Sequence, residues 1–251
     1  MKNSSDNDLQ LQHRPEEISK RLNTPPKTQN LSDAVLGGID GCVTTFAVVS
    51  GAFGAGFSPV VALVLGFANL FADAFSMAVS NYEAIKAQKE FAEKIRLSEQ
   101  EHIERIPEGE KEEIRQIFQQ KGFEGETLDT IVETISQDKQ LWIETMLVEE
   151  HGLPKGNLSP VRSALTTFMA FISVGAIPLI PFLISCLEMQ SQFIISALLA
   201  AIMFFLIGML KSLFLDKPVL ISGISTLLTG GAAASLAFLT GYILREIIGI
   251  A

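Results

Sequence analysis

The sequence predicts an all-α, polytopic membrane protein with five transmembrane helices and a cytoplasmic three-helix domain inserted between helices 2 and 3. Hydrophobic residues make up 48% of the 251 residues and gather in blocks of membrane-spanning length, which in a helix is about 20 residues. The helical periodicity of the second block continues into a charged stretch. Acidic residues concentrate in one segment between the second and third blocks.

Residues 1–30 are polar and proline-containing, with no apolar core before a small-residue cleavage site. This composition argues against a signal peptide and predicts a disordered cytoplasmic tail. The alternative is an amphipathic surface helix around Pro15 to Leu22.

The apolar blocks predict helices 1 and 2 within 31–88 and helices 3 to 5 within 157–251. The blocks themselves cover roughly residues 33–58, 59–82, 162–187, 193–210 and 219–244. Ser32 can cap the first helix, whose glycines permit close packing against other membrane helices. Pro59 suits the first position of the second helix, so helices 1 and 2 are expected to form a tight hairpin.

The domain between helices 2 and 3 is expected to cover residues 89–156. Helix 2 should leave the membrane as a continuous rod to about Ile106, because Pro107 ends it. Further helices fit residues 108–121 and 126–150, where glycines and a proline follow. In the third transmembrane helix, Pro178 and Pro181 should produce a kink.

The charge distribution predicts both orientation and partners. Residues 82–162 hold 18 acidic and 11 basic residues, most of the net charge of −9. Such a segment disfavours nucleic acid and favours cations. Lysine and arginine are frequent in the tail and in this segment but absent from 51–60 and 184–192, which places the N-terminus and the acidic segment in the cytoplasm.

Two aspartates lie inside predicted membrane helices, Asp40 in the first and Asp73 in the second. An aspartate at mid-helix costs about 2.5 to 3.5 kcal/mol on insertion, so a cation or proton site is expected. The alternative is that each caps a kink or hydrogen-bonds a neighbouring helix. Asn69, Asp73 and Met77 share one helical stripe, and a carboxylate with a thioether favours a transition metal.

The acidic segment offers further candidate ligands at helical spacing. Glu99 and His102 form a Glu-x-x-His pair, and Glu110 and Glu113 form a Glu-x-x-Glu pair. The last helix adds Met146, Glu149 and Glu150. The alternative is a solvated, salt-bridged surface, but glutamate exceeds lysine so strongly that unpaired carboxylates are expected. A ferritin-like di-iron bundle is a second alternative, weakened because only one Glu-x-x-His motif is present.

Four runs resemble the vacuolar iron transporter family. They are DGCVTTFAVVSG from Asp40, LGFANLFADAFSMA from Leu65, the stretch from Glu99 to Glu113, and WIETMLVEEHGL from Trp142. The resemblance covers about residues 31–250. It implies a homodimer with five transmembrane helices per subunit, an ion path between subunits and a cytosolic metal-binding domain. It also implies Fe²⁺ export from the cytosol, coupled to inward proton movement.

Transferred to this sequence, the resemblance makes Asp40 and Met77 translocation ligands. It makes cytosolic metal ligands of Glu99, Glu110, Glu113, Met146 and Glu150. Three positions depart from the family pattern. His102 stands where relatives often carry a carboxylate, Leu147 where some carry a further ligand, and Asn69 where plant and fungal relatives carry a glutamate. Asp73 then becomes a candidate for proton coupling.

The resulting prediction is a dimeric iron(II) transporter in the lipid bilayer, not an enzyme and without a prosthetic group. Its cargo is Fe²⁺, with Mn²⁺ as a further candidate, exchanged for H⁺. The expected location is a prokaryotic plasma membrane, or the vacuolar membrane in a eukaryote. One rival is a membrane-anchored iron-binding or di-iron oxidase protein, and another is a structural membrane protein with an acidic surface.

Overall fold

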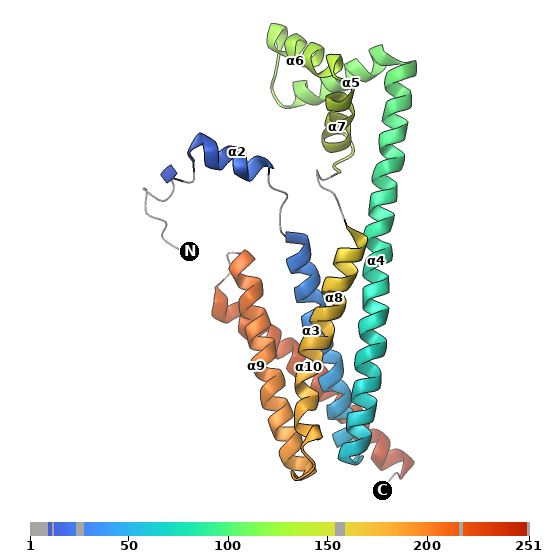
Figure 1. Ribbon diagram of the computed structural model, residues 1–251, viewed down its shortest axis with the longest axis vertical. Helices are drawn as coiled ribbons and strands as arrows, with labels where there is room; N and C mark the ends of the chain where they lie inside the picture. The colour runs from blue at the N-terminus through green and yellow to red at the C-terminus, as the bar shows by residue number, and fades with distance from the viewer. Residues whose placement is uncertain (1–9, 12, 24–27, 154–158, 216–217, 250–251) are drawn as a thin grey trace. The chain divides into compact units, whose positions relative to one another are not determined.

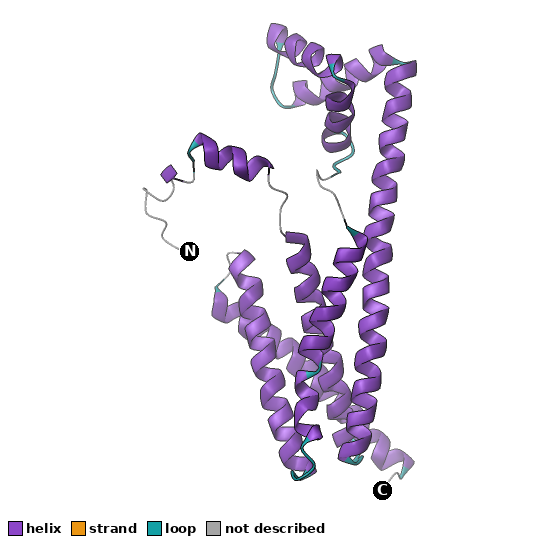
Figure 2. Ribbon diagram, viewed as in Figure 1, coloured by secondary structure: helices purple, strands orange, loops and turns teal. Residues whose placement is uncertain are grey.

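The computed structural model describes residues 10–11, 13–23, 28–153, 159–215 and 218–249. Within these ranges the regular secondary structure is helical, with no strand (Figure 2). The chain divides into two compact units, Met1–Tyr82 with Pro160–Ala251, and Glu83–Ser159. We call the first the apolar unit and the second the acidic unit.

The apolar unit contains long helices that pack side by side (Figure 1). Its elements are α2 (Pro15–Asn23), α3 (Thr28–Gly54), the first part of α4 (Pro59–Arg105), α8 (Pro160–Gly175), the 3₁₀ helix η1 (Ile177–Leu183), α9 (Met189–Leu215) and α10 (Val219–Ile248). Helix α3 contacts α8, α9 and α10, and α9 contacts α10 and η1. Buried apolar side chains from these helices, among them Phe46, Phe171 and Phe204, form one core.

Close approach between α3 and α8 depends on glycine. A methyl group built on Gly41 would lie 2.5 Å from the carbonyl oxygen of Phe171, and one on Gly37 would overlap the carbonyl oxygen of Thr167. Because these neighbours are backbone atoms, they cannot rotate away. The glycines predicted to let membrane helices approach therefore lie at such a contact.

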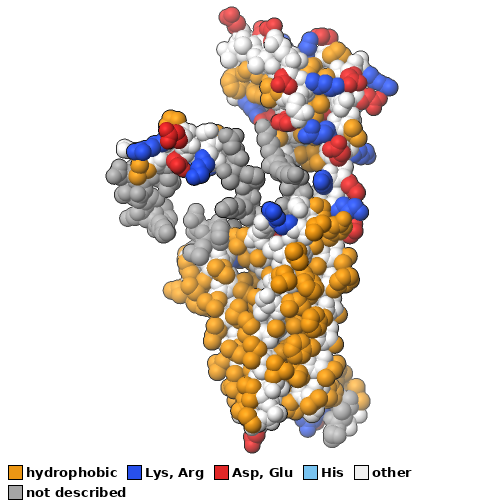
Figure 3. Space-filling view, in the orientation of Figure 1, with side chains coloured by type: hydrophobic (Ala, Val, Ile, Leu, Met, Phe, Trp, Pro, Cys, Tyr) orange, Lys and Arg blue, Asp and Glu red, His pale blue; other side chains and the backbone are white. Residues whose placement is uncertain are grey.

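Among the described residues, four helices are long and apolar enough to cross a membrane, at Asn30–Gly54, Pro59–Arg105, Met189–Ser212 and Val219–Ile248. Helix α8 and η1 are together also long and apolar enough to cross a membrane, and a 41° bend separates them. If the two form one bent span, it is the fifth. Pro178 and Pro181 lie in η1, so the kink predicted from these prolines is confirmed. On the visible face, hydrophobic side chains cover most of these helices (Figure 3).

The acidic unit combines the end of α4 with α5 (Pro107–Gln120), α6 (Gly125–Gln137) and α7 (Lys139–Glu149). Helix α4 is unbroken up to Arg105 and Pro107 opens α5, as expected from the sequence. Helix α6 contacts both α5 and α7. The acidic unit has its own apolar core, which fixes how these helices meet and includes Ile103, Ile114, Val132 and Trp142.

Two sequence expectations need correction. The helix predicted at 126–150 is two helices, because Asp138 adopts an extended conformation and its Oδ1 accepts hydrogen bonds from the backbone N–H groups of Gln140 and Leu141. This is an N-cap, which begins a new helix. In the segment expected to be a disordered tail, Pro15–Asn23 forms α2, the amphipathic alternative. Residues 1–9, 12 and 24–27 of that segment lie outside the described residues.

Candidate metal centre

The candidate ligands of the acidic unit come from three helices. Glu99 and His102 lie on the last turns of α4, Glu110 lies on α5, and Glu150 and His151 directly follow α7. The break at Pro107 turns the chain back, which lets α5 present Glu110 to the end of α4. Residues that are distant in the sequence are thereby brought together.

Two carboxylates of this unit are buried. Glu99 is 3% exposed and Glu110 is 1% exposed. One oxygen of each, Oε2, has no hydrogen-bond partner among the described residues. A buried polar group without a partner is rare, and a buried charge is costly unless it is paired or coordinates a metal. These two oxygens are therefore candidates to bind a cation or a proton.

His102 joins these carboxylates in a first group. Its Nδ1 lies 3.4 Å from Oε1 of Glu110, and its Nε2 lies 3.5 Å from Oγ of Ser98. Glu99, His102 and Glu110 can each offer one ligand atom such that all three atoms lie within 4.8 Å of one another. Three converging side-chain donors of this kind fit a transition-metal cation.

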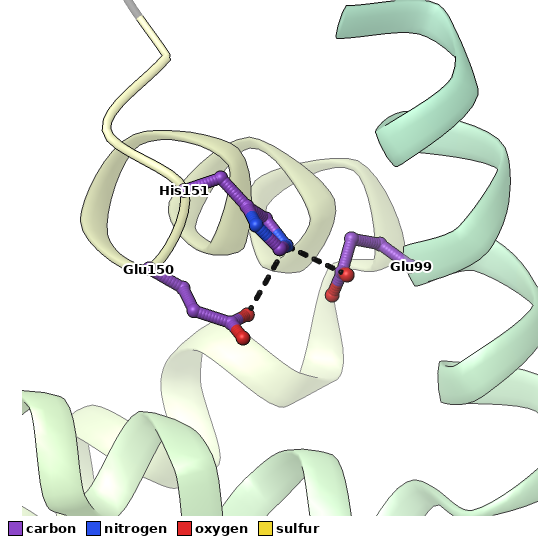
Figure 4. A group of neighbouring side chains, drawn as sticks. All are labelled: Glu99, Glu150 and His151. Atoms are coloured by element: carbon purple, nitrogen blue, oxygen red, sulfur yellow. Dashed lines mark hydrogen bonds and ion pairs between the residues drawn. The ribbon is translucent and has the colours of Figure 1, made fainter. Parts of the chain in front are cut away.

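Glu99 also belongs to a second group, with Glu150 and His151 (Figure 4). The Nε2 atom of His151 lies 3.0 Å from Oε1 of Glu99 and 3.4 Å from Oε2 of Glu150. His151 was not among the ligands expected from the sequence. The sequence feature that could have pointed to His151 is the distribution of histidines, because two of the three in the chain fall in the acidic unit.

Burial and mutual repulsion raise the pKa values of two carboxyl groups in this centre. Burial raises the pKa of Glu110 to about 7, with further contributions from the negative charges of Glu113 and Glu99. Burial also raises the pKa of Glu150, although the neighbouring His151 opposes the rise. Carboxylates that are hard to ionise together are stabilised in the ionised form by a cation.

The remaining predicted ligands have different surroundings. Glu113 is exposed on α5, and its negative charge acts on Glu110. Met146 is fully buried in the apolar core that contains Ile114 and Trp142. No contact of either residue tests a metal-binding role, so both roles stay predictions.

The salt-bridged surface weighed as an alternative describes only the outside of this unit. Exposed ion pairs join Lys111 to Glu108 and Arg105 to Glu101, and Lys139 donates a hydrogen bond to Glu104. Exposed pairs of this kind contribute little to stability. The buried Glu99 and Glu110 differ from them, because their nearby nitrogen partners are imidazoles.

The apolar unit holds the predicted membrane-embedded residues. Asn69 Nδ2 donates a 2.8 Å hydrogen bond to Oδ2 of Asp73 on the same helix. This bond is not the contact with a neighbouring helix that was weighed as the alternative. Asp40 is partly buried on α3, and Asp73 acts on it electrostatically. Met77 packs against the apolar core. These contacts leave the translocation roles untested.

A polar cluster that sequence reasoning missed links three helices of the apolar unit. Asn81 Nδ2 on α4 donates to Oδ1 of Asp33 on α3 at 2.9 Å and to Oγ1 of Thr167 on α8 at 2.8 Å. Asp33 is 6% exposed, and its Oδ2 has no hydrogen-bond partner in the described part of the chain. Its sequence position at the edge of an apolar block gave no sign of burial.

Comparison with known proteins gives one consistent family. The chain is 30% identical over 239 residues to a vacuolar iron transporter of Toxoplasma gondii, an alignment covering 92% of this chain and 79% of the relative. It is 32% identical over 225 residues to a vacuolar iron transporter of Plasmodium berghei, covering 86% and 82%. Vacuolar iron transporter 1 of Arabidopsis thaliana is 30% identical over 207 residues, covering 82% of each. The sequence model of the VIT family matches residues 31–242, and the chain therefore belongs to the VIT family.

Proposed function

We propose that this protein transports Fe²⁺ across a membrane, out of the cytosol. The observation that carries the proposal is the pair of buried carboxylates, Glu99 and Glu110, each beside an imidazole nitrogen in a chain with membrane-spanning helices. Relatives at about this level of identity are named vacuolar iron transporters. The family and the site thus support the same kind of cargo.

The acidic unit is proposed to collect the cation on the cytosolic side. Its carboxylates concentrate cations, since a patch of one charge sign raises the local concentration of counter-ions. Its mixed nitrogen and oxygen donors suit a borderline cation such as Fe²⁺ better than Mg²⁺ or Ca²⁺, which prefer oxygen alone. Mn²⁺ is a second candidate cargo because carboxylates also suit it.

Asp40 and Met77 are proposed to bind the cation during translocation, within a homodimer. A carboxylate in a membrane helix is costly, and a carboxylate that takes either a proton or a metal couples the two. Asp73, which accepts a hydrogen bond from Asn69, is proposed as the second carboxylate of this pathway. Proton antiport through these aspartates is the mechanism we propose.

The rival is a membrane-anchored metal-binding protein in which the spans only tether the acidic unit. Tethering gives no reason for an aspartate, Asp40, inside a helix that is apolar and long enough to cross a membrane. This observation favours transport. A di-iron oxidase would also require further ligands in a four-helix core.

Flux into proteoliposomes tests the proposal. Purified protein is reconstituted around an entrapped metal-sensitive dye, and Fe²⁺ is added anaerobically with and without a pH gradient. We expect flux that depends on the gradient, that is abolished in Asp40→Asn, and that persists in Ser235→Ala on an exposed face of α10. If wild-type protein binds iron yet produces no flux, the transport proposal is wrong and the tethered metal-binding protein is the better account.

A further inference from the structure

We propose that His151 is a metal ligand and that the acidic unit binds two cations that share Glu99. One cation is held by Glu99, His102 and Glu110, and the other by Glu99, Glu150 and His151. The proposal rests on the metal binding proposed above. It adds a ligand, His151, that the family resemblance does not assign.

The distances around His151 are those of atoms that surround one ion. Metal–ligand bonds to nitrogen and oxygen are about 2.0 to 2.2 Å, so neighbouring ligand atoms of one ion lie about 3.0 to 3.5 Å apart. Nε2 of His151 is 3.0 Å from Oε1 of Glu99 and 3.4 Å from Oε2 of Glu150. Ligand atoms of all three residues lie within 4.8 Å of one another.

Glu99 has a carboxylate oxygen available for a second cation. Its Oε1 faces His151, while its buried Oε2 has no hydrogen-bond partner among the described residues. The neighbouring group contains a second such oxygen, Oε2 of Glu110. A carboxylate can bind one cation with each oxygen, so Glu99 can bridge the two groups to which it belongs. This arrangement explains why both buried oxygens have no protein partner.

The backbone fixes His151 in place at the end of α7. The backbone N–H of His151 donates to the carbonyl oxygen of Met146, and the N–H of Leu153 donates to that of Leu147. Gly152 between them has φ +63°, the left-handed conformation that glycine adopts at helix ends. Leu153 then packs on the apolar core of the unit. The side chain of His151 stays 27% exposed, which leaves room for water on an ion bound there.

Two imidazoles change which cations the unit prefers. Imidazole suits iron, cobalt, nickel and zinc, whereas an all-carboxylate site suits manganese and magnesium. A cation held by His151 and two carboxylates is therefore a later transition metal. Replacing His151 by aspartate keeps a ligand atom but removes the nitrogen, so the preference should move toward Mn²⁺.

Calorimetric and optical titration of the full-length protein in detergent with Co²⁺ tests the proposal. Beyond the site proposed at Asp40 and Met77, which every variant keeps, we expect two tight equivalents per chain for wild type and one for His151→Leu. The affinity for the other cation should be about ten- to hundredfold weaker in His151→Leu. His13→Leu removes a histidine outside the acidic unit and should retain both. His151→Asp should retain both equivalents while gaining Mn²⁺ affinity relative to Co²⁺.

Two results would overturn the proposal. One is a His151→Leu titration that matches wild type and His13→Leu. The other is loss of the second equivalent in His151→Asp as well as His151→Leu, because the side chain would then act through packing rather than coordination. Proteoliposome flux distinguishes failure of the His151 proposal from failure of the proposed transport function. Wild type that transports while His151→Leu binds normally removes only the His151 assignment, and wild type that binds two equivalents without flux removes only the transport.

Discussion

Nε2 of His151 lies 3.0 Å from Oε1 of Glu99, although 52 residues separate them along the chain. The contact joins the end of α4 to the residue after Glu150, so it closes the acidic unit around its core. Because the same atoms form part of the candidate metal centre, we expect folding of this unit and metal binding to be coupled. A cation bound here would join α4 to the end of α7, which also meet through the apolar core and the Lys139–Glu104 ion pair.

Metal should therefore stabilise the acidic unit against unfolding. A ligand that binds only the folded state stabilises it by about 2.7 kcal/mol when present at a hundred times its Kd. We expect Co²⁺ or anaerobic Fe²⁺ to raise the unfolding temperature of the wild-type protein and a chelator to reverse the shift. In Glu99→Gln the shift should be much smaller, because both groups lose their common ligand. Glu108→Gln, an exposed residue paired with Lys111, is the matched control and should respond like wild type.

The metal-free protein should lose stability as pH rises, through Glu110. Burial raises its pKa from the usual 4.5 to about 7. A carboxyl group with a raised pKa in the folded state contributes stability that is complete below pH 4.5 and is lost as pH rises through about 7. The unfolding temperature of chelated wild type should therefore fall between pH 5 and 8 relative to Glu110→Gln, which cannot titrate. Parallel pH curves for the two proteins would show that Glu110 is not the responsible group.

The affinity of the protein for Co²⁺ should change with pH in the opposite direction, rising as pH rises. A metal ligand must be deprotonated, so metal affinity rises with pH until Glu110 is ionised near pH 7. We expect the Kd for Co²⁺, measured by calorimetry, to fall as pH rises from 6 to 7.5 in wild type. The dependence should be shallower in Glu110→Gln. An affinity that is constant over this range would exclude Glu110 as a ligand.

Most helices were predictable because their signals are local. Pro107 ends one helix and opens the next, and Pro178 and Pro181 end the α-helical part of the third predicted span. Asp138 was missed because the apolar spacing across it is compatible with one continuous helix, whereas its capping hydrogen bonds depend on one backbone conformation. Periodicity detects helices better than it detects a break between them.

Residue spacing predicted candidate ligands only where they share a helix, and the family resemblance was needed to group Glu99 with Glu110 and Glu150. Glu99 with His102 follows from the spacing of adjacent helical turns, and the structure brings Glu110 to them. The role of His151 depends on a tertiary contact across 52 residues, and the burial of Asp33 depends on Asn81, 48 residues away. Such contacts are set by how the helices pack, which a single sequence does not display.

Removing the amide of Asn81 should destabilise the apolar unit. Its Nδ2 donates to both Asp33 and Thr167, and hydrogen bonds to charged groups contribute about 1.5 to 3 kcal/mol. Asn81→Leu leaves the buried carboxylate of Asp33 without its amide donor, so we expect a lower unfolding temperature in detergent. Thr240→Val removes a hydroxyl that bonds only within exposed α10 and should change little. If the two variants unfold alike, the cluster does not hold α3, α4 and α8 together.

Two glycine-to-alanine substitutions should have opposite effects in the apolar unit. In Gly41→Ala the new methyl group would lie 2.5 Å from the carbonyl oxygen of Phe171, and backbone cannot yield without separating α3 from α8. We expect a marked loss of stability for this variant. In Gly231→Ala nothing lies within 4 Å of the new methyl group, and alanine favours a helix over glycine by about 1 kcal/mol. Thermal unfolding in the same detergent should rank Gly231→Ala at or above wild type and Gly41→Ala well below it, whereas an equal effect of both would mean that α3 and α8 do not depend on this close approach.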